Sequence, residues 1–197
     1  MKLTGRKLTI QQRAERYNKD FPKYPPLVVH GRWLYGNWTF GQNYKGSGYY
    51  GAYPPTYLKR LSAVFPEMAY GMVLHLFSGS LDASVRGVRV DINPKLSPDV
   101  VADARKLDEH FEPNTFDLIV ADTPYSAEHA TRYNTSMPAR NAVFQSMAKV
   151  VKPGGHVAWL DTKMPMFRKS EWLWWGAINL IRSTNHDFRD VVMFERK

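Results

Sequence analysis

The chain has 197 residues, at the upper end of the range of about 100–200 residues that one domain usually spans. With 44% hydrophobic and 23% charged residues, its composition excludes a wholly disordered or fibrous chain. It contains no cysteine, which excludes disulfides, thiolate metal sites and cysteine nucleophiles. Because no apolar run is long enough to cross a bilayer, we expect a cytoplasmic protein that does not associate with membranes.

Positive charge and aromatic side chains concentrate in the first third of the chain. Of the net charge of +9, residues 1–70 contribute +8, from eleven Lys and Arg against three Asp and Glu. Fourteen of the 27 aromatic residues also lie there. This combination is typical of a segment that contacts nucleic acid, a polyanion whose bases stack on aromatic rings. The alternative is a solubilising segment followed by a layer of aromatic packing residues.

These first seventy residues divide into two parts. Residues 1–25 are polar and basic, and we expect a flexible arm there with one amphipathic stretch over residues 8–17. Residues 26–70 form a Gly/Tyr-rich extension, which we expect to pack on the core. It holds short β-like segments around residues 27–35, and the spacing of its apolar side chains predicts a helix over residues 57–65.

Residues 71–197 alternate between apolar strands and helices or loops. Five short apolar runs are each followed by polar residues, Gly or Pro: MVLHLF, VRVDI, DVVADA, FDLIVAD and HVAWLD. Such runs predict a parallel sheet that is covered on both faces. A helix is predicted over residues 139–150, and a C-terminal hairpin from residues 177–181 and 191–194. We therefore expect an α/β fold with an open, twisted sheet that binds its ligand at the carboxyl ends of the strands.

Three acidic residues, Asp91, Asp103 and Asp122, fall at or directly after predicted strand ends, and a glycine turn at residues 78–80 follows the first strand. A glycine lets the backbone approach a ligand closely, and a carboxylate at the next strand end can chelate two ribose hydroxyls. A further carboxylate can accept the amino group of an adenine. The set favours a nucleoside-containing cofactor, although each Asp alone is also typical of a helix cap or turn.

The segment Asp122-Thr123-Pro124-Tyr125 directly follows the apolar strand FDLIVA. A carboxylate and a backbone carbonyl can accept both protons of a planar amine, while a tyrosine ring stacks on the base that carries it. Pro124 biases Thr123 toward an extended conformation, which presents the Thr123 carbonyl. The segment therefore predicts a site that aims the lone pair of an amine at an electrophile. An ordinary strand exit containing proline is the alternative.

Together these motifs resemble class I S-adenosylmethionine-dependent methyltransferases that act on amino groups of nucleic acids. HLFSGS is similar to the family's D-P-F-x-G-S-G cofactor motif, DTPY to its catalytic D/N-P-P-Y/F motif, and VKPGGHVAWLD to the L-K-P-G-G before its fifth strand. With GYYGAYPP ahead of the cofactor motif, the sequence is similar to small phage- or prophage-type DNA N6-adenine methyltransferases. Over residues 71–197 the resemblance implies a Rossmann-like, doubly wound and mostly parallel seven-stranded sheet with a C-terminal antiparallel hairpin.

The resemblance also implies roles for particular residues. The catalytic segment comprises Asp122, Thr123, Pro124 and Tyr125. The residues that would bind S-adenosylmethionine are Phe77, Ser78, Gly79, Ser80, Asp91, Ile92, Asp103, Ala104 and Tyr53. Asp at the first catalytic position leans toward adenine N6 in DNA, with short or relaxed sequence specificity that residues 1–57 and 126–138 would supply. No metal is implied, and the expected location is the cytoplasm of a bacterium or of a phage-infected host.

The sequence departs from this family in ways that leave other functions open. His75 stands where the family usually has an acid, and Thr123 replaces a proline. Only twelve residues separate Gly79 from Asp91, so the first helix must be very short or replaced by a loop. The alternatives are an RNA base methyltransferase (guanine N2 or adenine N6), a methyltransferase for another amine, and an inactive nucleic-acid-binding protein with a degenerate cofactor site.

Overall fold

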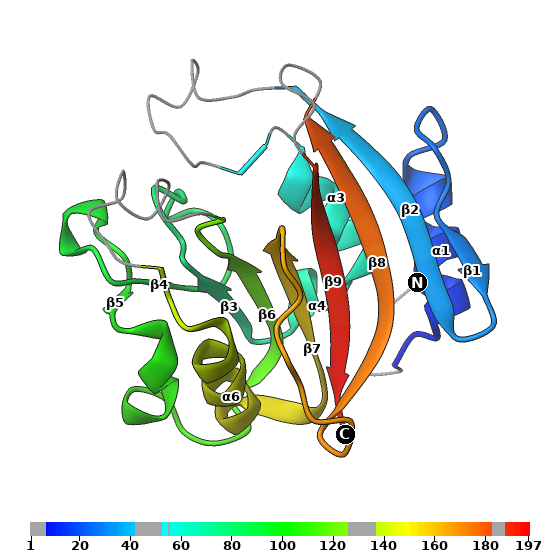
Figure 1. Cartoon of the computed structure of the whole chain (residues 1–197). Coiled ribbons are helices and arrows are strands. Elements are labelled where there is room, and N and C mark those ends of the chain that lie inside the picture. The colour runs from blue at the N-terminus through cyan, green and yellow to red at the C-terminus, as the bar shows by residue number, and fades with distance from the viewer. Residues whose placement is uncertain (1–6, 42–52, 55, 126–136, 183–187) are drawn as a thin grey trace.

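The computed structural model describes residues 7–41, 53–54, 56–125, 137–182 and 188–197 (Figure 1). Most of GYYGAYPP and of the expected recognition segment at residues 126–138 lies outside these residues. The strands are β1 (Val28–His30), β2 (Trp33–Phe40), β3 (Val73–Leu76), β4 (Val88–Asp91), β5 (Val100–Val101), β6 (Phe116–Asp122), β7 (Val151–Asp161), β8 (Trp172–Arg182) and β9 (Phe188–Arg196). The helices are α1 (Ile10–Asp20), α3 (Tyr57–Val64), α4 (Glu67–Tyr70), α6 (Arg140–Val150) and the 3₁₀ turns η1 (Pro94–Leu96) and η2 (Ala104–Glu109).

The described strands form a single mixed sheet in the order β1-β2-β8-β9-β7-β6-β3-β4-β5. The pairs β2–β8, β7–β6, β6–β3, β3–β4 and β4–β5 are parallel. The C-terminal hairpin is confirmed, since β9 is antiparallel to both β8 and β7. The five apolar runs of the sequence all become strands, because each run is short, apolar and bounded by turn residues.

The sheet has nine strands in the described part of the chain, and seven of them, β3 to β9, come from residues 71–197. The two additional strands, β1 and β2, come from the N-terminal extension and cover the edge of β8, so the extension continues the sheet. Gly176 makes the β2–β8 contact possible, because a Cβ there would lie 2.6 Å from the carbonyl oxygen of Leu34. Pairing this edge also removes an exposed row of backbone groups.

Helices cover both faces of the sheet (Figure 1). Side chains of α1 and α3 belong to one apolar cluster, with Trp38, Leu118 and Ile178 on the strands. Side chains of α6 and η2 belong to a second cluster, with Ile119, Trp159 and others. This three-layer arrangement leaves the carboxyl ends of β3, β4 and β6 free to hold a site.

Within residues 7–25, the described part of the expected N-terminal arm, α1 is an ordered helix that overlaps the predicted amphipathic stretch. It begins with a capping box in which Thr9 and Gln12 exchange hydrogen bonds. Its Arg13 is buried and donates to both carboxylate oxygens of Glu67, at 3.0 and 2.5 Å. The same guanidinium lies 2.9 Å from Nε2 of His156. The helix is therefore docked on the core by a buried charged cluster that no local periodicity reveals.

The loop between β3 and β4 contains no helix in the described residues 77–87, as the short spacing predicts. His75 explains part of its shape, since its Nε2 lies 3.0 Å from the carbonyl oxygen of Arg86. Gly87, with φ at +128°, packs so closely on this imidazole that a Cβ would lie 2.8 Å from it. Burial lowers the pKa of His75, so the neutral ring donates to Arg86 and fastens the loop.

Candidate active site

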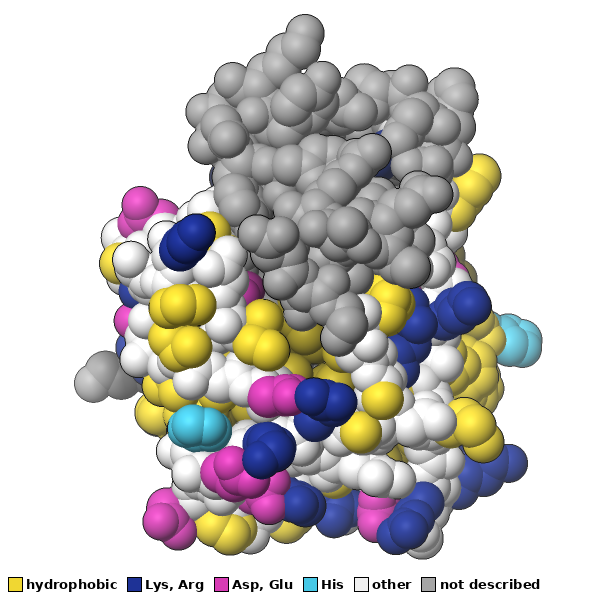
Figure 2. All heavy atoms as spheres, turned by 60° about the vertical axis from the view of Figure 1, so that its left-hand side comes forward, with side chains coloured by type: hydrophobic (Ala, Val, Ile, Leu, Met, Phe, Trp, Pro, Cys, Tyr) yellow, Lys and Arg dark blue, Asp and Glu magenta, His cyan; other side chains and the backbone are white. Residues whose placement is uncertain are grey.

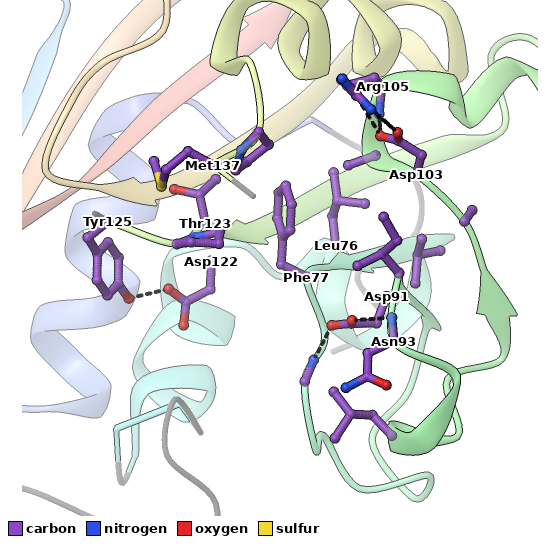
Figure 3. A pocket seen from close by; sticks show the side chains of 18 residues that line it. Leu76, Phe77, Asp91, Asn93, Asp103, Arg105, Asp122, Thr123, Tyr125 and Met137 are labelled. Atoms are coloured by element: carbon purple, nitrogen blue, oxygen red, sulfur yellow. Dashed lines mark hydrogen bonds and ion pairs between the residues drawn. The ribbon is translucent and has the colours of Figure 1, made fainter. Parts of the chain in front are cut away.

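One pocket opens at the carboxyl ends of β3, β4 and β6 and joins most of the predicted site residues (Figure 3). Figure 2 shows the side of the molecule that carries β4, β5 and α6, where apolar side chains gather among acidic and basic groups. The lining residues that the sequence predicts are Phe77, Gly79, Asp91, Ile92, Asp103, Ala104, Asp122, Thr123, Pro124 and Tyr125. The pocket thus combines six of the nine predicted cofactor residues with the predicted catalytic segment.

Three predicted cofactor residues are absent from this lining. Ser78 is buried and its hydroxyl has no hydrogen-bond partner within the described part of the chain, whereas Ser80 is exposed. Tyr53 stacks on Tyr57 with ring centroids 5.2 Å apart and packs against the core. The structure therefore places Tyr53 in an aromatic layer, and its assignment to the methionine end of a cofactor stays a prediction.

The Asp91 carboxylate organises the first half of the pocket. Its Oδ2 accepts the N–H of Gly79 at 2.9 Å, and its Oδ1 accepts the N–H of Asn93 at 2.9 Å. Each oxygen retains a lone pair, so the carboxylate can still accept two ligand hydroxyls. Phe77, which also lines the pocket, has a φ of +59°, a strained backbone conformation that in bulky residues concentrates at functional sites.

Asp103 and Ile92 lie on the same side of the pocket. Asp103 caps η2 by accepting the N–H of Arg105 at 2.9 Å and also pairs with the Arg105 guanidinium. This pairing lowers the pKa of Asp103, so the group is an ionised acceptor. Ile92 is 50% exposed, which gives the pocket an apolar surface against which a flat ring can pack. This half of the pocket suits a nucleoside with a free amino group.

Asp122 lies at the end of β6, across the pocket from Asp91 (Figure 3). Burial raises the pKa of its carboxyl to about 6, although Arg189, the hydrogen bond from Tyr125 and Arg182 each lower it. Its Oδ1 accepts the Tyr125 hydroxyl, while among the described residues no donor is bonded to Oδ2. Oδ2 is therefore available to a donor such as an amine.

Tyr125 is held by contacts with two charged residues of the site. The ring is half-buried, and its hydroxyl lies between the Asp122 carboxylate and the Arg189 guanidinium. Arg189 comes from β9 and also lies over the ring, 4.1 Å from its centroid. Sequence analysis missed Arg189 because it is distant in the chain from the catalytic segment, and only the fold brings it to Tyr125.

Asp161 is a second site residue that sequence analysis missed. It ends β7, its side chain is 0% exposed, and its Oδ2 accepts the Thr123 hydroxyl at 2.6 Å. Arg140, the first residue of α6, donates to the same carboxylate at 2.6 and 3.0 Å. A signal for Asp161 exists in the sequence, since it follows the run HVAWL just as Asp122 follows FDLIVA.

No group of three or more His, Asp or Glu among the described residues is placed to hold a metal ion. Within the same residues, no helix has the length and apolar character needed to span a bilayer.

Comparison with known proteins places the fold. No protein-family model and no curated protein matches the sequence. The structure is similar to TrmN from Thermus thermophilus, with a TM-score of 0.53 at 17% identity, over 75% of this chain and 50% of TrmN. The chain therefore spans about half the length of that protein. At this identity the likeness concerns the fold, and it agrees with the α/β architecture expected from the sequence.

Two further solved structures are similar at lower scores. One is the trans-methyltransferase CalH in complex with S-adenosylhomocysteine (SAH), with a TM-score of 0.45 at 12% identity, over 67% of this chain and 53% of CalH. The other is an rRNA methylase from Streptococcus thermophilus, with a TM-score of 0.41 at 10% identity, over 64% of this chain and 86% of the methylase.

Proposed function

We propose that the protein transfers a methyl group from S-adenosylmethionine to an exocyclic amino group of a nucleic-acid base. The observation that carries this proposal is that one pocket holds two kinds of group. The residues around Asp91 suit a nucleoside, and Asp122 on the other side suits an amine. We further propose adenine N6 in DNA as the preferred acceptor, because the catalytic segment begins with Asp and the chain carries a basic, aromatic N-terminal segment.

The residues of the first half fit the adenosyl part of the cofactor. Asp91 would accept the two ribose hydroxyls with the lone pairs that Gly79 and Asn93 leave free. Ile92 would pack on the purine, and Asp103 would accept its amino group. When bound, S-adenosylmethionine supplies a sulfonium-borne methyl group, whose C–S bond breaks as the new C–N bond forms and SAH is left.

Asp122 would orient the acceptor. Its Oδ2 accepts a hydrogen bond from the target amine, which fixes the nitrogen and stabilises the positive charge that develops on it during transfer. Because in-line displacement needs little acid–base help, the main contribution of the site is proximity and orientation. The proton that the methylated nitrogen releases passes to Asp122 or to water. Above pH 6 the carboxylate is mostly ionised and able to fill this role.

A labelling experiment tests this function. The protein is incubated with isotopically labelled S-adenosylmethionine and duplex DNA, single-stranded DNA or total RNA, and the nucleosides are separated by mass. We expect labelled N6-methyladenine from DNA, lost in Asp122→Asn and retained in Asp117→Asn. Asp117 is the matched control because it lies at the opposite end of the same strand. There it accepts hydrogen bonds from the Lys152 side chain and the Met72 backbone N–H.

Other outcomes separate the alternatives. Label in guanine or adenine of RNA would support methyl transfer to a base but would show that the acceptor is RNA and not DNA. Cofactor binding by calorimetry without label in any nucleic acid would indicate a different amine as substrate. If wild-type protein neither binds S-adenosylmethionine nor transfers label, the proposal is wrong and the chain is a binding protein with a degenerate site.

A further inference from the structure

The Asp161 carboxylate, at the end of β7, accepts hydrogen bonds from both side chains and backbone. Its oxygens accept the Thr123 hydroxyl, two donors of Arg140 and the backbone N–H groups of Thr162 and Lys163. The carboxylate is fully buried, and Arg140 is only 18% exposed. A buried ion pair of this kind gives little net stability, because desolvation offsets most of the attraction.

The contacts of this pair converge on the catalytic segment. Asp161 holds the Thr123 side chain, and the Arg140 guanidinium reaches the carbonyl oxygen of Tyr125 at 3.4 Å. The N–H of Thr123 additionally donates to the Leu160 carbonyl at 3.3 Å. Residues on both sides of Pro124 are thus tied to the end of β7 and the start of α6. A proline at position 123 would have neither the hydroxyl nor the N–H.

The position of Arg140 supports a role in the site. It is the first residue of α6, where the helix dipole disfavours a cation. The first turn of α6 has no acidic residue, and the N-cap, Ala139, makes no side-chain hydrogen bond to the helix. An arginine here works against the local stability of the helix, and such departures from local preference are expected at functional sites.

From this geometry we propose that Asp161 is a positioning residue, which acts through Thr123 and Arg140 to hold the Asp122–Tyr125 segment in its reactive geometry. The proposal rests on the proposed function. Asp161 need not touch the substrate, because it is buried behind the segment. Misplacement of a reacting group by about 1 Å can reduce a rate about 100-fold, so release of this anchor should lower turnover without weakening cofactor binding.

The test uses the full-length protein and two kinds of readout. Asp161→Asn keeps the shape of the side chain but loses the charge that pairs with Arg140. We expect amide hydrogen exchange in residues 118–125 to become several-fold faster and kcat to fall about 10- to 100-fold, while the KM for S-adenosylmethionine stays within about 2-fold. Asp117→Asn, at the opposite end of β6, should change neither quantity.

Substitutions at Thr123 distinguish positioning from general structural support. Thr123→Val removes the hydroxyl at nearly constant volume and should reproduce the faster exchange and the lower kcat, whereas Thr123→Ser should retain wild-type behaviour. The double variant Thr123→Val, Asp161→Asn should lose less activity than the sum of the two single changes predicts, because both changes release the same segment.

Two results would overturn the proposal: unchanged exchange in residues 118–125 of Asp161→Asn, or faster exchange with an unchanged kcat. If wild-type protein methylates no acceptor, the proposed function fails, but the exchange rates still decide whether Asp161 holds the segment. If wild-type protein is active and Asp161→Asn matches it in both readouts, the proposed function stands and the positioning role fails.

Discussion

The guanidinium of Arg189 lies 4.1 Å above the ring of Tyr125 and donates to its hydroxyl, which in turn donates to Asp122. These two hydrogen bonds connect β9 with the end of β6 through the Tyr125 hydroxyl. Arg189 is buried, with 4% of its surface exposed, so water screens its charge weakly. Arg189 and Tyr125 therefore help to keep the Asp122 carboxylate ionised in a buried position that would otherwise favour its protonated form.

The first prediction concerns the pH dependence of activity. Because Asp122 must be ionised to accept the amine, kcat/KM should rise with pH around an apparent pKa of about 6 and then level off. Arg189→Gln removes the main influence that lowers the pKa of Asp122, so the rise should move to higher pH by about one unit or more. Lys152→Gln, whose lysine pairs with Asp117, serves as the control and should leave the profile in place. An identical profile in Arg189→Gln would contradict the role of the chain Arg189–Tyr125–Asp122.

The second prediction concerns stability. The pKa of Asp122 is about 6 in the folded state against 3.8 for an ordinary aspartate, so the folded state binds more protons between these values. The contribution of this group to the free energy of unfolding therefore falls as the pH rises through that window. Asp122→Asn carries no such charge and should be more stable than wild type at pH 8, by no more than about 3 kcal/mol.

The measurement is urea denaturation of both proteins at pH 4 and pH 8, and the gain should be small or absent at pH 4. Asp117→Asn, for which no comparable gain is expected, controls for the loss of a carboxylate. Equal stability of wild type and Asp122→Asn at both pH values would mean that burial does not destabilise the Asp122 charge. A gain confined to pH 8 would identify the carboxylate as a group kept for function at the expense of stability.

The strands and the first half of the site follow from local sequence patterns. Apolar runs bounded by turn residues are set by neighbours in the chain, so MVLHLF or FDLIVAD indicates a strand without knowledge of its partner. In a parallel sheet the carboxyl ends meet at one edge, and this brings Asp91 and Asp122 to one pocket. The short spacing between Gly79 and Asp91 likewise predicts the loop that replaces a helix.

What the patterns miss depends on contacts between distant segments. The pairing of β2 with β8 needs Gly176 opposite Leu34, and neither segment reveals the other. The docking of α1 depends on the contact between Arg13 and Glu67. In the sequence alone, Arg13 cannot be distinguished from the other basic residues of the N-terminal segment. Asp161 is different, because the strand-end rule that identifies Asp91 and Asp122 also applies to it.

The third prediction tests the docking of α1. Arg13→Ala leaves Glu67 buried without its cation, and breaking such a pair costs about 3–5 kcal/mol in the free energy of unfolding. Lys106→Ala breaks an ion pair with Glu109 whose partners are both 58% exposed, and it should be far less destabilising because water screens an exposed pair. Urea denaturation measures both. If Arg13→Ala were no more destabilising than Lys106→Ala, the buried contact between Arg13 and Glu67 would not stabilise the docking of α1.

The fourth prediction concerns the basic N-terminal segment as a nucleic-acid contact. Deleting it would remove the docked helix α1, so single charges have to be changed instead. Lys19, Lys23 and Arg32 are exposed and lie on the same N-terminal part of the chain as the exposed rings of Tyr24 and Tyr35. Each cation that contacts a phosphate of duplex DNA contributes about 0.9 to the slope of log K against log salt concentration.

Replacing all three by Gln should therefore reduce the magnitude of that slope by up to about 2.7, with weaker binding at low salt. Lys106→Gln with Lys149→Gln is the control, because these lysines already pair with Glu109 and Asp108 on the opposite edge of the sheet. Fluorescence anisotropy with a labelled duplex at several salt concentrations gives the slopes. Because the slope depends on released counterions rather than on catalysis, it can be measured in Asp122→Asn as well. If the triple variant has the same slope as wild type, these three side chains do not contact the phosphates and the prediction is wrong.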